Sequence, residues 1–286
     1  MIKIIDTYPL LPDVFEDKNF QFDKWEKYID SVYPNAASIF ITDMEKCIAT
    51  EQFTWENDYL PVLNMVVRNK ELRELAHESF CKVTEGLEQK VHKIFGKSLD
   101  VDIVFYLGLC NGAGWVKQHS DRTIVFLGIE KIMELNWCSI DDMHGLIYHE
   151  LGHVYHKQYG ILDRQFQNDA QSFLWQLYKE GIAMYFEQVL VGDSDYYHED
   201  KNGWKEWSDT HFEDIKRDFT CDLKTMTFST QRYFGDWVNY RGHSDVGYYL
   251  GCRFVHFIVA MYEFDSIISF DIDKVTDLYG QFTRSQ

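Results

Sequence analysis

Apolar side chains recur at helical spacing in the middle of the chain. From Ser139 onward they stand three or four positions apart, which gathers them into one narrow stripe of a helix. The stripe consists of Ile140, Met143, Ile147, Leu151 and Val154. Asp142 follows Ser139 at the spacing of a capping box, so the helix is expected to begin there. His149, His153 and His156 fall on roughly the opposite side, so the helix can pack its stripe on a core and direct its histidines into a cleft.

The same spacing predicts three further helices. An amphipathic helix is expected over residues 69–95, ended by Gly96, and a largely buried helix over residues 170–190. A final helix is expected to begin at Ser244 or Asp245 and to run past Met261.

Two runs of β-branched and aromatic residues, 101–107 and 122–127, predict strands joined by a glycine-rich loop at 111–114. These elements together indicate a predominantly helical α+β fold, in which a small mixed β-sheet packs on the histidine-bearing helix and the C-terminal half is helical. Residues 1–96 are expected to form a helical N-terminal region packed on a catalytic part, residues 97–286. The two parts can also be read as one continuous domain.

Composition narrows the class of protein. The 286 residues carry a formal charge of −18, which argues against nucleic acid and anionic membranes as partners, although acidic charge also serves solubility. No run approaches 18 apolar residues, and the first residues lack a secretory signal, so a cytoplasmic protein is expected. The six cysteines stand singly, which predicts reduced side chains packed as small hydrophobic groups.

The predicted histidine-bearing helix contains His149-Glu150-Leu151-Gly152-His153. Two histidines four residues apart project from one face of a helix, where both imidazoles can reach a single metal ion. Glu150 stands between them, placed to take a proton from a water that the metal activates.

A third ligand is expected from the helix over residues 170–190. Glu180 lies in its apolar stripe, where a carboxylate needs a strong partner. Glu187 lies on the same side two turns later and is the rival candidate. Glu180 is favoured because Gly181 beside it removes bulk near a close neighbour.

With these residues the chain resembles the gluzincins, zinc peptidases in which a downstream glutamate completes a His-Glu-x-x-His site. It is most similar to a bacterial family of predicted zinc-dependent proteases, and more distantly to thermolysin-like and aminopeptidase N-like enzymes. Three segments carry the resemblance: His149-Glu150-Leu151-Gly152-His153, Lys179-Glu180-Gly181-Ile182-Ala183 and Gly247-Tyr248-Tyr249-Leu250-Gly251.

The resemblance implies a zincin-like fold and one Zn²⁺ per chain, held by His149, His153 and Glu180, with Glu150 as the general base. It assigns oxyanion stabilisation to Tyr248, three residues before a glycine, with Tyr249 as the alternative.

The chain also departs from these families. Thermolysin-like enzymes carry an aspartate four residues after the glutamate ligand, where this chain has Met184, so another residue must orient the first histidine. The Gly-x-Met-Glu-Asn segment of aminopeptidases is missing, which puts aminopeptidase activity in doubt. His156 lacks the downstream spacing of metzincins, so a position on the cleft wall or surface is expected.

The resulting hypothesis is a zinc-dependent hydrolase that cleaves peptide bonds of a peptide or protein substrate. Two alternatives remain: a zinc-binding regulatory protein of the same fold without turnover, and a structural protein in which the histidine pair is accidental. Glu150 and Tyr248 argue against the first, because metal binding alone requires neither, and the position of Glu180 argues against the second.

Overall fold

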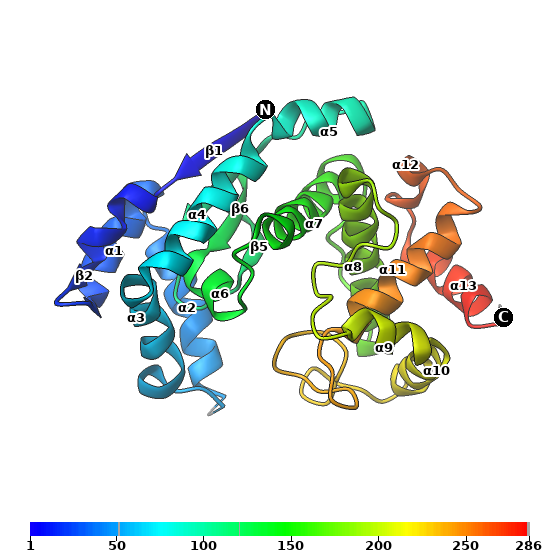
Figure 1. Cartoon of the computed structure of the whole chain (residues 1–286). Helices are drawn as coiled ribbons and strands as arrows, with labels where there is room; N and C mark the ends of the chain where they lie inside the picture. The colour runs from blue at the N-terminus through cyan, green and yellow to red at the C-terminus, as the bar shows by residue number, and fades with distance from the viewer. Residues whose placement is uncertain (51, 120, 285–286) are drawn as a thin grey trace. The chain divides into compact units, whose positions relative to one another are not determined.

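The computed structural model describes residues 1–50, 52–119 and 121–284. It has an α+β fold made mostly of helices with a small mixed sheet, as predicted (Figure 1). The chain divides into two compact units, Met1–Glu150 and Leu151–Gln286, and the division falls inside one unbroken helix, α7 (Ile140–Tyr159). This division differs from the boundary expected after residue 96, because the first strand of the chain joins the sheet of the later strands.

The main sheet has four strands in the order β1-β4-β6-β5. Their bounds are β1 Ile2–Asp6, β4 Val101–Tyr106, β5 Gly114–His119 and β6 Arg122–Gly128. β4 is parallel to both β1 and β6, whereas β5 is antiparallel to β6 and forms an edge. The two predicted strands are thus confirmed as β4 and β6. The glycine-rich loop does not join them directly, because it leads into β5 first.

The two strands that the sequence did not reveal, β1 and β5, are the edges of this sheet. Each is only partly buried, and β5 carries the exposed side chains of Lys117 and Gln118. An edge strand needs no continuous apolar run, so its pattern is weak. A two-residue hairpin, β2 (Phe15–Glu16) and β3 (Asn19–Phe20), forms a separate small sheet.

Short helices make up the rest of the first unit. They are the 3₁₀ helix η1 (Tyr8–Val14), α1 (Phe22–Val32), α2 (Ala37–Ile48), the π-helix η2 (Trp55–Tyr59), α3 (Leu60–Arg68), α4 (Lys70–Thr84), α5 (Leu87–Phe95) and α6 (Ile129–Glu134). The single helix expected over residues 69–95 is therefore wrong: it is two helices, α4 and α5. They are interrupted at Gly86, whose backbone is left-handed with φ 69° and leaves the helical path. Gly96 ends α5 as predicted.

A fully buried carboxylate, Glu130, holds the loop after β4. Its two oxygens accept hydrogen bonds from the backbone N–H groups of Gly108 (2.9 Å) and Cys110 (3.1 Å). Burial raises the pKa of Glu130 to about 7, even though these hydrogen bonds favour the charged form. This loop precedes the edge strand β5, so Glu130 fixes where β5 begins.

The second unit is helical apart from its connections. After the C-terminal turns of α7 it contains α8 (Asp169–Val191), α9 (Trp204–Thr210), α10 (Phe212–Asp222), α11 (Val246–Val259), α12 (Phe264–Ile267) and α13 (Ile272–Phe282). The final helix expected to run past Met261 ends at Val259, and two further helices that the sequence did not indicate follow it.

Helices α8 and α11 lie side by side, and glycines allow their closest approach (Figure 1). A Cβ atom at Gly181 of α8 would overlap the carbonyl oxygen of Gly251 of α11. A Cβ atom at Gly251 would in turn overlap the carbonyl oxygen of Leu177. The close neighbour expected beside Gly181 is therefore the backbone of α11.

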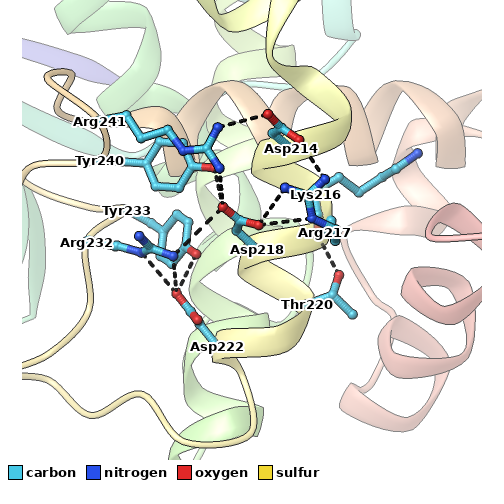
Figure 2. Close-up of polar contacts among 10 residues, drawn as sticks. All are labelled: Asp214, Lys216, Arg217, Asp218, Thr220, Asp222, Arg232, Tyr233, Tyr240 and Arg241. Atoms are coloured by element: carbon cyan, nitrogen blue, oxygen red, sulfur yellow. Dashed lines mark hydrogen bonds and ion pairs between the residues drawn. The ribbon is translucent and has the colours of Figure 1, made fainter.

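Three aspartates on one side of α10 anchor the segment over residues 223–245, which leads into α11. They are Asp214, Asp218 and Asp222, and their partners in that segment are Arg232, Tyr233, Tyr240 and Arg241 (Figure 2). Asp218 accepts hydrogen bonds from the Tyr240 hydroxyl (2.8 Å) and the Arg241 guanidinium (2.9 Å). Burial alone would raise the pKa of Asp218, but the hydrogen bonds and nearby arginines hold it below its ordinary value. The Asp218 carboxylate is therefore charged at neutral pH and helps to fix the segment on α10.

Every helix in the described parts of the chain is too short or too polar to cross a membrane. All six cysteines are free, in line with the prediction that they are reduced. The prediction that all are packed as small hydrophobic groups is wrong. Cys138 and Cys252 are buried, whereas Cys81 and Cys221 are exposed on helices that face solvent.

Candidate metal centre

Helix α7 begins as its sequence predicts. The Ser139 hydroxyl donates to the Asp142 carboxylate (2.6 Å) and accepts from the Asp142 backbone N–H (3.2 Å), so the two residues cap the helix together. Four of the five apolar stripe residues are fully buried, and only Ile140, at the open end, is exposed. The buried stripe fixes the rotation of α7 and thereby the direction in which His149 and His153 project.

A second close helix approach brings α8 against α7. A Cβ atom at Gly152, inside the histidine pair, would lie 2.7 Å from the Cα atom of Ala183 on α8. The glycine therefore lets the two backbones come together beside His153. Asn168 caps the start of α8 by accepting a hydrogen bond from the Gln171 N–H (3.0 Å).

Glu180 reaches His153 across this approach. Its Oε2 lies 3.0 Å from His153 Nε2, and its Oε1 lies 3.6 Å from the Lys179 ammonium. Glu180 is buried, with 6% of its surface exposed, so the carboxylate has found the strong partner that its apolar surroundings require.

His149, His153 and Glu180 form one cluster, in which a nitrogen or oxygen atom from each residue lies within 4.8 Å of the others. His149 stands just before the division of the chain and His153 just after it, but both belong to the unbroken helix α7, which fixes their spacing. The structure therefore brings together the three residues that the sequence proposed as ligands.

The donor set of this cluster fits zinc. Two imidazoles and one carboxylate are the ligands of many catalytic zinc sites, which keep a fourth position for water or substrate. Two ligand atoms of one tetrahedral zinc lie about 3 to 3.5 Å apart, and the 3.0 Å between His153 and Glu180 lies within that range. His149 and Glu180 are buried and His153 is partly exposed.

Glu150 points toward the edge of the sheet. A Cβ atom at Gly114, the first residue of β5, would lie 2.7 Å from Glu150 Oε1. The carboxylate is buried, with 7% of the residue exposed, and it is not part of the ligand cluster. Glu150 thus stands next to the proposed ligands and against the start of the edge strand.

The rival glutamate, Glu187, has a different partner. Both of its carboxylate oxygens lie 3.0 Å from Nδ1 of His198, and His198 Nε2 lies 3.2 Å from Glu199. His149, Glu187 and His198 form a second group of donor atoms within 4.8 Å, and all three residues are buried. His149 therefore belongs to both groups. A carboxylate beside a metal-binding histidine commonly orients the imidazole, and Glu187 can supply this function in place of Met184, whose thioether side chain is buried in the core.

His198 is a residue that sequence reasoning missed. It lies in the polar segment between α8 and α9, outside any periodic element. Its only signal is proximity to two acids, Glu199 and Asp200, which many exposed histidines share. Tertiary folding alone brings it to Glu187.

The two candidate tyrosines on α11 differ in environment. Tyr249 is fully buried, and its hydroxyl donates a hydrogen bond to Asp209 Oδ1 (2.6 Å). The hydroxyl has only one proton, so it cannot at the same time donate to an oxyanion. Burial, with the neighbouring carboxylate, raises the pKa of Tyr249 well above its ordinary value. Tyr248 is only half-buried, and its ring lies near Phe234. The geometry therefore removes the support for Tyr249, while the role of Tyr248 stays a prediction.

His156 was expected on the cleft wall or the surface, and that expectation is wrong. It is fully buried against the rings of Trp175 and Tyr178, with centroid distances of 6.3 and 5.9 Å. Burial lowers its pKa to about 3, so it is a neutral core residue at physiological pH. Three residues beyond His153, His156 has turned toward the interior of the second unit.

The chain was also compared with known proteins. No protein-family model matches it, and neither a curated protein nor a solved structure matches it.

Proposed function

We propose that this protein is a zinc-dependent hydrolase with a zincin-like fold that cleaves peptide bonds. The observation that carries the proposal is the cluster of His149, His153 and Glu180 with a buried carboxylate, Glu150, beside it. Structural zinc sites usually have four protein ligands, whereas this cluster supplies three and has a buried carboxylate next to them in the sequence.

His149, His153 and Glu180 would hold the zinc ion. When bound, zinc lowers the pKa of a water ligand to about 7 and polarises a carbonyl oxygen. Glu150 would accept the proton from the attacking water and deliver it to the leaving amine, as a general base and then a general acid. The Glu150 carboxylate lies against the first residue of β5, and this contact would restrict its orientation during proton transfer.

A peptide is the favoured substrate class because of β5. Among the described strands β5 pairs only with β6, so its other edge presents backbone N–H and C=O groups. An extended peptide can pair with such an edge as an additional strand. Glu150 lies against the first residue of this strand, so a peptide aligned on β5 would pass the base.

Metal content and turnover together test the proposal. The protein should contain about one zinc per chain at this centre, and His149→Ala or His153→Ala should remove it. His144→Ala is the matched control, because His144 lies on the same helix outside the cluster. A zinc content in the His149→Ala/His153→Ala double variant as high as in the wild type would overturn the ligand assignment.

Glu150→Gln separates an enzyme from a binding protein. The variant keeps the shape of the side chain and removes the base, so zinc should stay and turnover should fall by about 10² to 10⁴-fold. A peptide-library digest read by mass spectrometry provides the substrate for this assay. Zinc binding without any cleavage of the library would favour a regulatory protein without turnover, and full activity of Glu150→Gln would exclude the mechanism.

Oxyanion stabilisation is assigned to Tyr248. Tyr248→Phe should keep zinc and lower kcat by about 10² to 10³-fold, because the hydroxyl acts on charge that develops in the transition state. Tyr249→Phe should change stability rather than kcat, because the Tyr249 hydroxyl is bound to Asp209. A larger kcat loss in Tyr249→Phe than in Tyr248→Phe would reverse the assignment.

A further inference from the structure

Three side chains with metal-binding chemistry meet in the first unit, on the opposite edge of the sheet from β5. Asp6 ends β1, while His77 and Cys81 lie four residues apart on α4. His77 Nε2 lies 2.7 Å from Asp6 Oδ2 and 3.5 Å from Cys81 Sγ. One donor atom from each residue lies within 4.8 Å of the other two.

The geometry around His77 is unusual for a hydrogen-bond network. The carboxylate and the sulfur converge on the same ring nitrogen, Nε2, which can offer only one proton. In a cysteine nucleophile activated by histidine and aspartate, the two partners would bind opposite ring nitrogens. The arrangement therefore does not fit nucleophilic catalysis. A single cation at the point of convergence would satisfy all three groups.

The distances agree with a tetrahedral metal ion. Zinc–nitrogen and zinc–sulfur bonds of about 2.0 and 2.3 Å, at a tetrahedral angle, separate the two ligand atoms by about 3.5 Å. This equals the observed distance between His77 Nε2 and Cys81 Sγ. The Asp6 oxygen, 2.7 Å from His77 Nε2, would move roughly 0.6 Å farther from that nitrogen to exchange its hydrogen bond for a metal bond.

Tyr8 holds two of the three groups in place. Its backbone N–H donates to Asp6 Oδ1 (2.9 Å), which turns the other carboxylate oxygen toward His77. Its ring stacks on the His77 imidazole, with centroids 3.9 Å apart and planes within 3°. The Tyr8 hydroxyl in turn accepts from Arg73 (3.3 Å). Such supporting contacts orient ligands before a metal arrives.

We propose that Asp6, His77 and Cys81 form a second metal site, for zinc or another divalent ion that binds thiolate and imidazole. The mixed sulfur, nitrogen and oxygen donors select against magnesium and calcium, which prefer oxygen alone. The site is partly exposed and joins the end of β1 to α4, so bound metal would fasten the edge strand to the helix above it. This proposal is independent of the function proposed for the α7 and α8 cluster.

Cobalt(II) distinguishes the two sites, because thiolate coordination gives a charge-transfer absorption in the near ultraviolet that imidazole and carboxylate ligands do not. The experiment titrates metal-free, reduced full-length protein with Co²⁺ alone. We expect a thiolate band in the wild type that reaches its maximum at one equivalent per site. Cys81→Ser and His77→Ala should abolish the band.

Two controls make the result specific. Cys221→Ser removes the other exposed cysteine, which belongs to none of the metal-donor groups found among the described residues, and should keep the band. The His149→Ala/His153→Ala variant should also keep it, so failure of the first metal centre cannot be mistaken for failure of this one. Absence of the band in the wild type, or its persistence in Cys81→Ser, would overturn the proposal.

Discussion

Replacing Gly181 by alanine would insert a methyl group at the closest approach of α8 and α11. The new Cβ atom would overlap the carbonyl group of Gly251, and neither backbone can move aside as a flexible side chain can. Overpacking of a core costs about 1 to 3 kcal/mol, and more where backbone must shift. Alanine regains about 1 kcal/mol of helix propensity. Because the overlapping atoms belong to the backbone, we take a cost of about 3 kcal/mol or more, so the free energy of unfolding should fall by about 2 kcal/mol or more.

Gly280→Ala is the matched control, since it makes the same change in a helix of the same unit. The nearest atom to a Cβ there is 3.6 Å away, in the flexible side chain of Arg284. This variant should be neutral or more stable by up to about 1 kcal/mol.

Thermal and urea unfolding followed by circular dichroism compare the two variants with the wild type. A loss of about 2 kcal/mol corresponds to a fall in Tm of roughly 4 to 8 °C. If Gly181→Ala were as stable as Gly280→Ala, the close helix approach could not be the reason for glycine at position 181.

Three other predictions concern carboxylates. Glu180→Gln should weaken zinc binding more strongly than Glu187→Gln in a competition with a chelator, because Glu180 is the proposed ligand and Glu187 is proposed only to orient His149. The reverse order would exchange their roles. The pKa of Glu130 is raised to about 7 in the folded protein, so its contribution to stability is greatest below pH 4.5 and is lost as the pH rises through 7, by up to about 3 kcal/mol. Glu130→Gln should remove this part of the pH dependence of the free energy of unfolding, measured with urea. An unchanged pH dependence in the variant would contradict the prediction. Asp218→Asn should cost about 1 kcal/mol and speed hydrogen exchange over residues 231–241, whereas unchanged exchange would mean that the ion pairs do not hold that segment.

The features that could be predicted from the sequence are those that local spacing decides. Two histidines four residues apart on a helix face the same way wherever that helix packs, so the relation of His149 to His153 needed no knowledge of the fold. The Ser139 cap and the buried strand β4 are local in the same sense. Edge strands and short helices after α11 were missed because their patterns are too weak or too short to distinguish from loops.

His156 shows where local spacing fails. Its position on α7 places it about 20° from His149 and about 60° from His153, so a helical projection puts all three on one side. The helices that pack against successive turns of α7 differ, however, and by the turn of His156 the neighbour is the aromatic core around Trp175. Which side of a helix meets a cleft thus depends on tertiary neighbours, and these change along its length.

The choice between Glu180 and Glu187 has the same origin. The two carboxylates lie on one side of α8 about two turns apart, and periodicity cannot separate them. In the structure each has a histidine of its own, His153 for Glu180 and His198 for Glu187, and His149 lies within reach of both pairs. Two glutamates on one stripe are therefore not rivals for one position. Each buried carboxylate has an imidazole partner, and His149 belongs to both groups of donor atoms.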